Sequence, residues 1–267
     1  MRSAMIALLL MLGAAQVFAT DLVFVPAPKG ESQKAVFQPI AELIGEKLGK
    51  TVVVAEAENF LIYENMLQKK NPDLVWSGSH FISWLIEYKG YSALARLPQP
   101  QTWVIIGSGP TINAVNDLVG RVICAHAPPN FGTLALLSKF PNPTRQPFIL
   151  QTVGWKKIYE CVASGKGVGG ILPLAQLKKF DGDTHRVKLL ETLPPNVNQA
   201  FAVSPRISSA DQEKIRGALL SAEGQNALTA LRTEYSNGKP LVAATNDEFK
   251  NVDAILATER GFEPTIK

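Results

Sequence analysis

The sequence predicts an α/β protein of two lobes, between which the chain crosses twice. Within residues 21–76, three short apolar stretches alternate with segments of helical spacing, a pattern typical of a parallel sheet covered by helices. A second series of strands and helices fills about residues 102–195. Prolines mark the passages into and out of this series, at residues 98–100 and 194–195. We therefore expect two lobes joined by two hinge crossings.

The N-terminal residues have the pattern of a secretory signal peptide. Arg2 precedes an apolar block over residues 4–15, and Val17 and Ala19 suit positions −3 and −1 of a cleavage site. The block is shorter than the roughly 20 residues that a membrane-spanning helix needs. We expect residues 1–19 to be removed by cleavage near Ala19, and the rest of the chain to be exported to the periplasm as a soluble protein.

The charge balance argues against a nucleic-acid partner. The chain carries 27 basic and 23 acidic residues, and one of the basic residues lies in the expected signal peptide. This excess is mild, and the sequence has no basic run with interleaved aromatic residues. A slightly positive protein still suits a small anion, so we expect a small-molecule ligand.

The first lobe begins with a strand and a loop that contains Lys29. This lysine either neutralises an anionic ligand or remains a solvated surface side chain. Asn59 is suited to cap a helix that Phe60 opens and that runs to Lys69. We expect the inward side chains of this helix to be Leu61, Ile62, Met66 and Leu67.

The C-terminal part of the chain reads as helical. Segments at residues 211–221, 223–235 and 246–260 have helical character and include no strands from which to form a separate sheet. We expect them to pack on the first lobe, which makes that lobe discontinuous in sequence. The resulting division is lobe 1 at residues 20–101 and 197–267, and lobe 2 at residues 102–196.

One stretch, residues 71–88, has the order turn, short strand, small-residue loop and helix. Residues 74–76 form an apolar run short enough to be a buried strand. Ser77, Gly78 and Ser79 then bring hydroxyls and backbone N–H groups to the start of the next helix, where an anion or polar ligand would sit. The alternative is that the serines only cap the helix.

We expect the other half of a ligand cleft in the second lobe, at residues 126–133, and a third edge at residues 152–155. This half has the same strand, loop and helix order as the first, so the two carboxyl ends of strands would face one another. The expected ligand contacts from the loop and the following helix are Asn130, Phe131, Gly132 and Thr133.

Histidines and tryptophans near these loops are candidates for the ligand site or for the core. His80 and His126 either donate to an anion or fill the surface between the lobes. Trp84 follows His80 by four positions, shares its helical face and reads as a core residue. Trp103 reads as core in a strand that follows the crossing. Trp155 opens a helix after a glycine, and it is the tryptophan we expect in the ligand site.

No pattern indicates an enzyme. The sequence contains no Gly-x-Ser-x-Gly elbow, no His-Glu-x-x-His and no Walker loop. The glycine-rich run at residues 165–170 leads into a strand rather than a helix, which is the wrong order for a phosphate loop. We expect no catalysis, no cofactor and no metal.

The two cysteines allow three interpretations. Cys124 lies in an expected strand and Cys161 in an expected helix. In an oxidising compartment they either form a disulfide, which would stabilise the fold by roughly 3–4 kcal/mol, or remain separate buried thiols. A thiol pair that captures a soft ligand is the third reading, and the spacing matches no zinc pattern.

The succession of segments resembles a known family. A signal peptide, a first lobe ending at residues 73–78, a strand at 103–106, a turn and strand at 117–122 and a helix closing at 163–166 are similar to the phosphate/phosphite/phosphonate-binding periplasmic proteins of ABC importers. The resemblance covers nearly all of the chain after the signal peptide. It implies a type II two-lobed solute-binding fold, in which hydroxyls and helix N-terminal amides hold an oxyanion.

Several ligand positions depart from the family pattern. Residues 129–131 read Pro-Asn-Phe where the family has Ser-Thr-Ser, and residues 153–155 read Val-Gly-Trp where it has Gly-Ser-His. Phe60 keeps an aromatic ring without a phenol, and Lys156 replaces an acidic residue. Losing three charge-assisted donors would cost several kcal/mol at roughly 1.5–3 kcal/mol each. We expect another small anion, a less charged oxyanion, or a flatter ligand that stacks on the aromatic residues gained.

The expected function is therefore solute binding between two lobes that close by hinge bending near residues 98–102 and 194–198. The resemblance implies an ABC permease as the partner. We expect the protein itself to be a monomer. The alternative is a sensory binding protein that presents its ligand to a membrane histidine kinase, and an exported enzyme on the same scaffold is a third reading.

Overall fold

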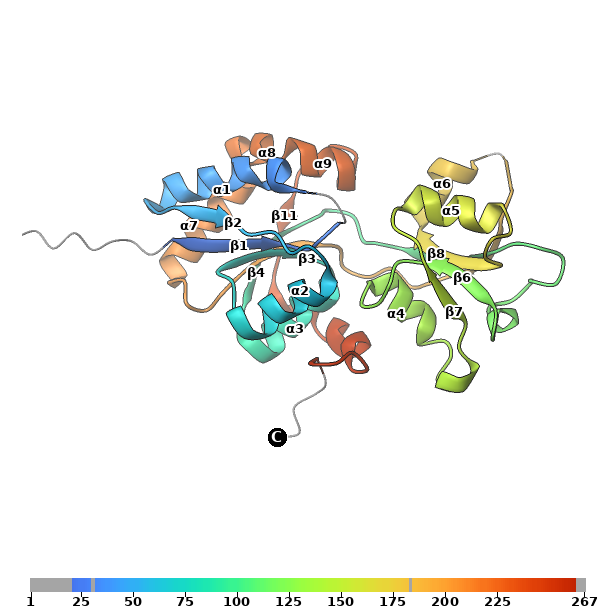
Figure 1. Cartoon of the computed structure of the whole chain (residues 1–267). Helices are drawn as coiled ribbons and strands as arrows, with labels where there is room; N and C mark the ends of the chain where they lie inside the picture. The colour runs from blue at the N-terminus through green and yellow to red at the C-terminus, as the bar shows by residue number, and fades with distance from the viewer. Residues whose placement is uncertain (1–20, 30–31, 183, 263–267) are drawn as a thin grey trace, which may run out of the picture.

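The computed structural model describes residues 21–29, 32–182 and 184–262. These residues form two lobes, each built on a mixed β-sheet with helices on its faces (Figure 1). Two separate segments of the chain connect the lobes. The expected α/β class and two-lobed architecture are therefore confirmed. The expected signal peptide at residues 1–19 lies outside the described residues.

The first lobe contains a sheet of six strands within the described chain, in the order β11-β4-β10-β3-β1-β2. β1 pairs in parallel with β2 and β3, as the alternation of strands and helices predicts. β10 is antiparallel to both β3 and β4, so a strand that returns from the second lobe lies inside the sheet. The strands are β1 (Leu22–Pro26), β2 (Val52–Val54), β3 (Leu74–Ser77), β4 (Ser92–Arg96), β10 (Ala200–Val203) and β11 (Val242–Ala243).

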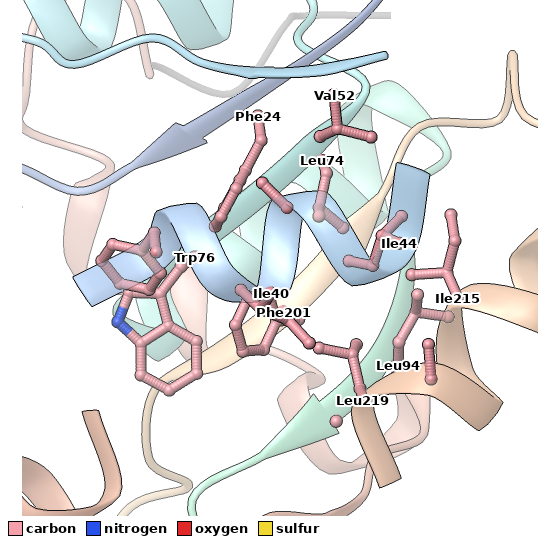
Figure 2. Close-up of a cluster of buried hydrophobic side chains, with 14 of the residues drawn as sticks. Phe24, Ile40, Ile44, Val52, Leu74, Trp76, Leu94, Phe201, Ile215 and Leu219 are labelled. Atoms are coloured by element: carbon pink, nitrogen blue, oxygen red, sulfur yellow. The ribbon is translucent and has the colours of Figure 1, made fainter. Parts of the chain in front are cut away.

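Four helices cover one face of this sheet (Figure 1). Phe24, Phe37, Trp76 and Phe201 pack together there, with ring centroids 4.7–6.4 Å apart. Figure 2 shows three of these rings beside aliphatic side chains from two of the helices. Burial of each such ring stabilises the fold by about 2–3 kcal/mol. The helices are α1 (Lys34–Leu48), α7 (Ser209–Leu220), α8 (Ala222–Ala227) and α9 (Thr229–Ser236).

Short helices cover the opposite face. Tyr63 packs edge-on against Phe81 with 5.5 Å between ring centroids, and Phe262 lies 5.5 Å from Phe81 and 4.9 Å from Trp84. The C-terminal part of the chain thus seals this side of the first lobe. The elements are α2 (Phe60–Asn65), the π-helical turn η1 (Met66–Lys70), α3 (Ser79–Lys89) and the 3₁₀ segments η4 (Asn246–Phe249) and η5 (Val252–Leu256).

Two expectations about these helices are wrong. Leu61 and Ile62 are 73% and 42% exposed, whereas Tyr63 is fully buried. The helix turns Tyr63 inward because its ring packs against the ring of Phe81. The expected helix at residues 246–260 is instead two 3₁₀ segments, separated by Asn251 with a positive φ of 64°. A left-handed residue at that position ends one helical turn before the next begins.

The second lobe has five strands among its described residues, in the order β7-β6-β8-β5-β9. The helix α4 (Phe131–Leu137) packs on one face of this sheet, whereas α5 (Trp155–Ala163) and α6 (Leu174–Asp181) pack on the other. A disulfide joins Cys124 in β6 to Cys161 in α5. The remaining elements are β5 (Trp103–Gly107), η2 (Val115–Leu118), β6 (Val122–Ala125), η3 (Pro143–Arg145), β7 (Phe148–Gln151), β8 (Gly169–Pro173) and β9 (Lys188–Thr192).

The two connecting segments lie side by side. Gln101 on the outgoing segment and Asn196 on the returning segment exchange two backbone hydrogen bonds of 2.8 and 2.9 Å. The proline-marked passages therefore form a short two-stranded connection. Among the helices that the structure describes, none is long and apolar enough to cross a membrane.

Candidate functional site

The first half of the site lies where β3 leads into α3. Ser77 ends the strand, Gly78 precedes the helix, and Ser79 and His80 form its first turn. The side chains of Ser77, Ser79 and His80 are buried, each at most 4% exposed. A Cβ atom at Gly78 would lie 2.8 Å from Cε1 of His80, so the glycine allows the imidazole to fold back over the loop.

The second half is the loop before α4. The Asn130 side chain accepts a hydrogen bond from the backbone N–H of Thr133 at 3.3 Å, and the Thr133 hydroxyl donates to the carbonyl of His126 at 2.7 Å. These two side chains, expected as ligand contacts, therefore hold the loop in shape. A Cβ atom at Gly132 would lie 2.3 Å from the Trp103 ring, so only glycine fits this approach.

The two halves touch each other directly. Nε2 of His80 lies 3.0 Å from the carbonyl oxygen of Pro129 in the second lobe, and the His80 ring meets Phe131 edge-on at 5.5 Å. At the hinge, the Asn196 amide donates to the Ser79 hydroxyl at 3.0 Å. The two lobes are thus in direct contact beside the hinge.

The C-terminal segment also bridges the lobes. η5 packs along α3 and reaches α4 of the second lobe, a placement visible below the first lobe in Figure 1. Ser83 on α3 donates to Asp253 at 2.7 Å, and Ile255 contacts the apolar clusters of both lobes. This segment therefore adds apolar contact between the lobes.

Several buried polar atoms at this junction lack a hydrogen-bond partner. They are Nδ1 of His80, Nε1 of Trp103, Oδ1 of Asn196, and the hydroxyls of Tyr63 and Ser77, which lie beside each other without the geometry of a hydrogen bond. An unpaired buried polar group costs about 1–3 kcal/mol, and folded proteins rarely leave several together. A cluster of this kind is what a bound polar ligand would satisfy.

The titratable groups here are neutral. Burial raises the pKa of Tyr63 well above its ordinary value, with the Ser77 hydroxyl beside it opposing part of the shift. Burial lowers the pKa of His80 to about 4, against the opposing effect of the Pro129 carbonyl. Burial also lowers the pKa of His126 to about 4. At neutral pH the junction therefore offers hydroxyls, an indole, amides and neutral imidazoles.

Acidification is expected to destabilise the fold. A histidine in the unfolded chain gains its proton near pH 6.5, whereas His80 in the fold remains neutral until about pH 4. Between these values the unfolded state binds more protons, so stability falls as the pH drops from about 6.5 to about 4. The melting temperature should fall across this range, and less steeply in His80→Gln. Equal slopes for the two proteins would contradict this role of His80.

Aromatic rings line the second-lobe side of the junction. Trp103 stacks with Phe131 at 6.1 Å and meets Trp155 at 5.5 Å, and Trp155 meets His126 at 4.4 Å. Trp155 thus lies between Trp103 and His126 in a continuous row of rings. These rings can pack against the apolar part of a ligand.

The structure does not bring every predicted site residue to this cluster. Phe60 stacks on Phe81 at 6.2 Å inside the first lobe. Lys29 forms an ion pair with Glu234 of α9 and lies 5.9 Å from the centre of the Tyr235 ring. Ser79, His80 and Phe131 do meet where the lobes touch, and Ser77, Gly78 and Gly132 are their neighbours in the chain.

Three polar residues of the junction are absent from the sequence-based set. Tyr63 follows Phe60 by three positions, a helical spacing that places both rings on one face and could have indicated it. Trp103 follows the first crossing and Asn196 lies in the second. Their position at the hinge could have indicated that they belong to the site. No group of three or more His, Cys, Asp or Glu side chains placed to bind a metal occurs in the described part of the chain.

Two α/β lobes in contact, with buried polar groups beside that contact, are typical of two-lobed solute-binding proteins. Residues 22–249 match the family model described as the periplasmic substrate-binding protein of the phosphonate ABC transporter. The chain therefore belongs to the phosphonate-binding periplasmic protein family of ABC transporters, a family of binding proteins and not of enzymes. None of the curated proteins is similar enough in sequence to count as a relative.

Solved structures share the fold at low sequence identity. XAC2383 from Xanthomonas citri, bound to ATP, has 10% identity and a TM-score of 0.71, and the match covers 92% of this chain and 98% of that one. PhnD1 from Prochlorococcus marinus, in complex with methylphosphonate, has 14% identity and a TM-score of 0.64, covering 88% and 97%. A binding component of an ABC phosphonate transporter from Pseudomonas aeruginosa has 12% identity and a TM-score of 0.61, covering 86% and 83%.

Proposed function

We propose that the chain binds a small oxyanion between its lobes and delivers it to the permease of an ABC importer. The observation that carries this proposal is the set of buried, unpartnered polar atoms where the lobes meet. Three of these groups can donate to an oxyanion: the hydroxyls of Tyr63 and Ser77 and the indole N–H of Trp103. Fixed donors in a buried site replace the hydration shell of the ligand.

The binding cycle requires the lobes to part. The unpartnered atoms are buried in the described structure, so a ligand reaches them only when the contact between His80 and Pro129 opens. The paired segments around Gln101 and Asn196 are the place for that hinge motion. Closure then brings donors from both lobes onto the ligand, and the closed shape is the one that a permease would recognise.

The predicted site residues take different roles in this proposal. Ser77 and His80 contact the ligand from the first lobe, and Phe131 and Trp155 form the aromatic wall on the second. Asn130 and Thr133 shape the loop through their backbone hydrogen bonds. The export of the chain by a signal peptide at residues 1–19 remains part of the same proposal.

A thermal-shift screen tests the function. Methylphosphonate, phosphite, phosphate and sulfate are added to the purified protein, and a ligand that binds only the folded state raises its melting temperature. We expect at least one of the phosphorus oxyanions to do so. If none of them shifts the melting temperature, and none binds by calorimetry, an oxyanion function is excluded.

Removing single donors is expected to weaken binding in a fold that Tyr63→Phe leaves intact and that Trp103→Phe destabilises only by the cavity of the smaller ring. Tyr63→Phe and Trp103→Phe each delete one buried, unpartnered donor while keeping an aromatic ring in place. Each should raise the Kd of the identified oxyanion about tenfold, since a tenfold change corresponds to about 1.4 kcal/mol. Titration calorimetry measures the affinity, and the melting temperature without ligand reports on the fold.

A matched control distinguishes the loss of a hydroxyl in the candidate site from the loss of a hydroxyl on the surface. Tyr88→Phe removes a hydroxyl from a half-exposed ring on α3 and should leave the Kd unchanged. Unchanged affinity in both Tyr63→Phe and Trp103→Phe would move the ligand away from this junction.

A further inference from the structure

The hydrogen bond between the lobes fixes the protonation of one imidazole. The Pro129 carbonyl oxygen can only accept, so Nε2 of His80, 3.0 Å away, must carry the hydrogen. The side chain is 4% exposed, and its burial holds the pKa near 4, so the ring is neutral at physiological pH. Nδ1 of His80 is therefore a bare lone pair that accepts hydrogen bonds and cannot donate them.

That lone pair is buried and unpartnered. A second unpartnered acceptor is Oδ1 of Asn196. The hydrogen bond from the amide nitrogen of Asn196 to the Ser79 hydroxyl identifies the other amide atom as this oxygen. Asn196 reaches Ser79, the residue before His80, so the two acceptors come from neighbouring parts of one junction. Each needs a hydrogen that the protein does not supply.

The same junction also contains donors, since the Trp103 indole can only donate and the hydroxyls of Tyr63 and Ser77 can do either. A ligand that satisfies this mixture must accept hydrogen bonds on some atoms and donate on at least one. A fully deprotonated anion would direct its own lone pairs at those of His80 and Asn196. Such a mismatch rejects a ligand by leaving buried groups unpaired.

We propose that the site selects an oxyacid that retains one O–H group, as a phosphonate or phosphite monoanion does, and that Nδ1 of His80 accepts the hydrogen bond from this group. The proposal rests on the proposed function and specifies the ligand class for it. The surrounding groups are neutral, which suits a ligand with a single negative charge. Burying a second charge on the ligand would cost more free energy than hydrogen bonds from neutral donors supply. His80 is thus a specificity-determining residue.

Methylphosphonate and methanesulfonate form a matched pair for the test. At a pH where methylphosphonate is a monoanion, both carry a methyl group, three oxygens and one negative charge, and only methylphosphonate keeps an O–H. We expect calorimetry on the full protein to give a Kd at least about 100-fold lower for methylphosphonate. Affinities within about threefold of one another would overturn the proposal while leaving an oxyanion function intact. If neither ligand binds and the screen above finds no oxyanion, both proposals fall together.

Two variants locate the discrimination at His80. His80→Gln keeps a donor near the Nε2 position for Pro129 but offers no acceptor at the Nδ1 position, whereas His80→Asn offers an amide oxygen there. The ratio of the two affinities should fall at least about tenfold in His80→Gln and be largely retained in His80→Asn. Because the ratio is taken within one protein, a partial loss of folded protein cancels. An unchanged ratio in His80→Gln would assign the discrimination to another group and contradict the proposal.

Discussion

Replacing Cys124 and Cys161 together by alanine is expected to lower the free energy of unfolding by about 4 kcal/mol. The two cysteines are 37 positions apart, and the disulfide restricts the unfolded chain by closing that loop. Both are buried in the apolar cluster between the second-lobe sheet and α5, on the face opposite α4. Denaturation in urea, followed by fluorescence, measures the loss.

Ligand binding should not change when the disulfide is removed. The bond lies on the other side of the sheet from Trp103 and Phe131, so the affinity for the proposed oxyanion ligand should remain within about twofold at a temperature where the variant is folded. Wild-type protein treated with a reductant is the matched control, and it should lose a similar amount of stability. A variant as stable as the oxidised wild type would mean that the two thiols do not pair in the protein.

The variant Gly132→Ala is expected to lose about 3 kcal/mol of stability and to bind ligand at least about tenfold more weakly. The added Cβ would meet two atoms of the Trp103 ring at 2.3 and 2.4 Å, far inside van der Waals contact. Trp103 cannot retreat easily, because it is 3% exposed and packed between Phe131 and Trp155. The start of α4 must shift instead, and this moves the preceding loop of the candidate ligand site.

Gly217→Ala is the control for this substitution. Gly217 lies inside α7, and a Cβ there would meet no heavy atom within 4 Å outside the local helix backbone. Alanine should therefore stabilise the protein, by about 0.5–1 kcal/mol, through its greater helix propensity. If Gly132→Ala were as stable as Gly217→Ala and bound ligand normally, this would contradict the close packing of α4 on Trp103.

Much of the fold can be predicted from local sequence patterns. Alternating strand and helix segments indicate the parallel core of β1, β2 and β3, and prolines indicate the crossings. The insertion of β10 between β3 and β4 could not be predicted, because it depends on pairing between segments more than 100 positions apart. The inward turn of Tyr63 in place of Leu61 likewise depends on a ring in a different helix, Phe81.

The candidate site was predictable where it follows from the ends of strands. Ser77, Ser79 and His80 come directly after β3, and parallel strands bind ligands at their carboxyl ends. The roles of Asn130 and Thr133 as loop supports could not be separated from ligand binding, since the same polar atoms serve both. Asn196 joins the site only through its bond to Ser79, which spans 117 positions of the chain.

A crystal structure of the protein grown with methylphosphonate tests the central claim most directly. The account predicts the phosphonate between the lobes, with its oxygens within hydrogen-bond distance of the Tyr63 and Ser77 hydroxyls and the Trp103 indole N–H. A phosphonate bound elsewhere, for example beside Lys50 and Arg206 at the cavity of about 500 Å³ on the first lobe, with these donors still unpartnered, would contradict it.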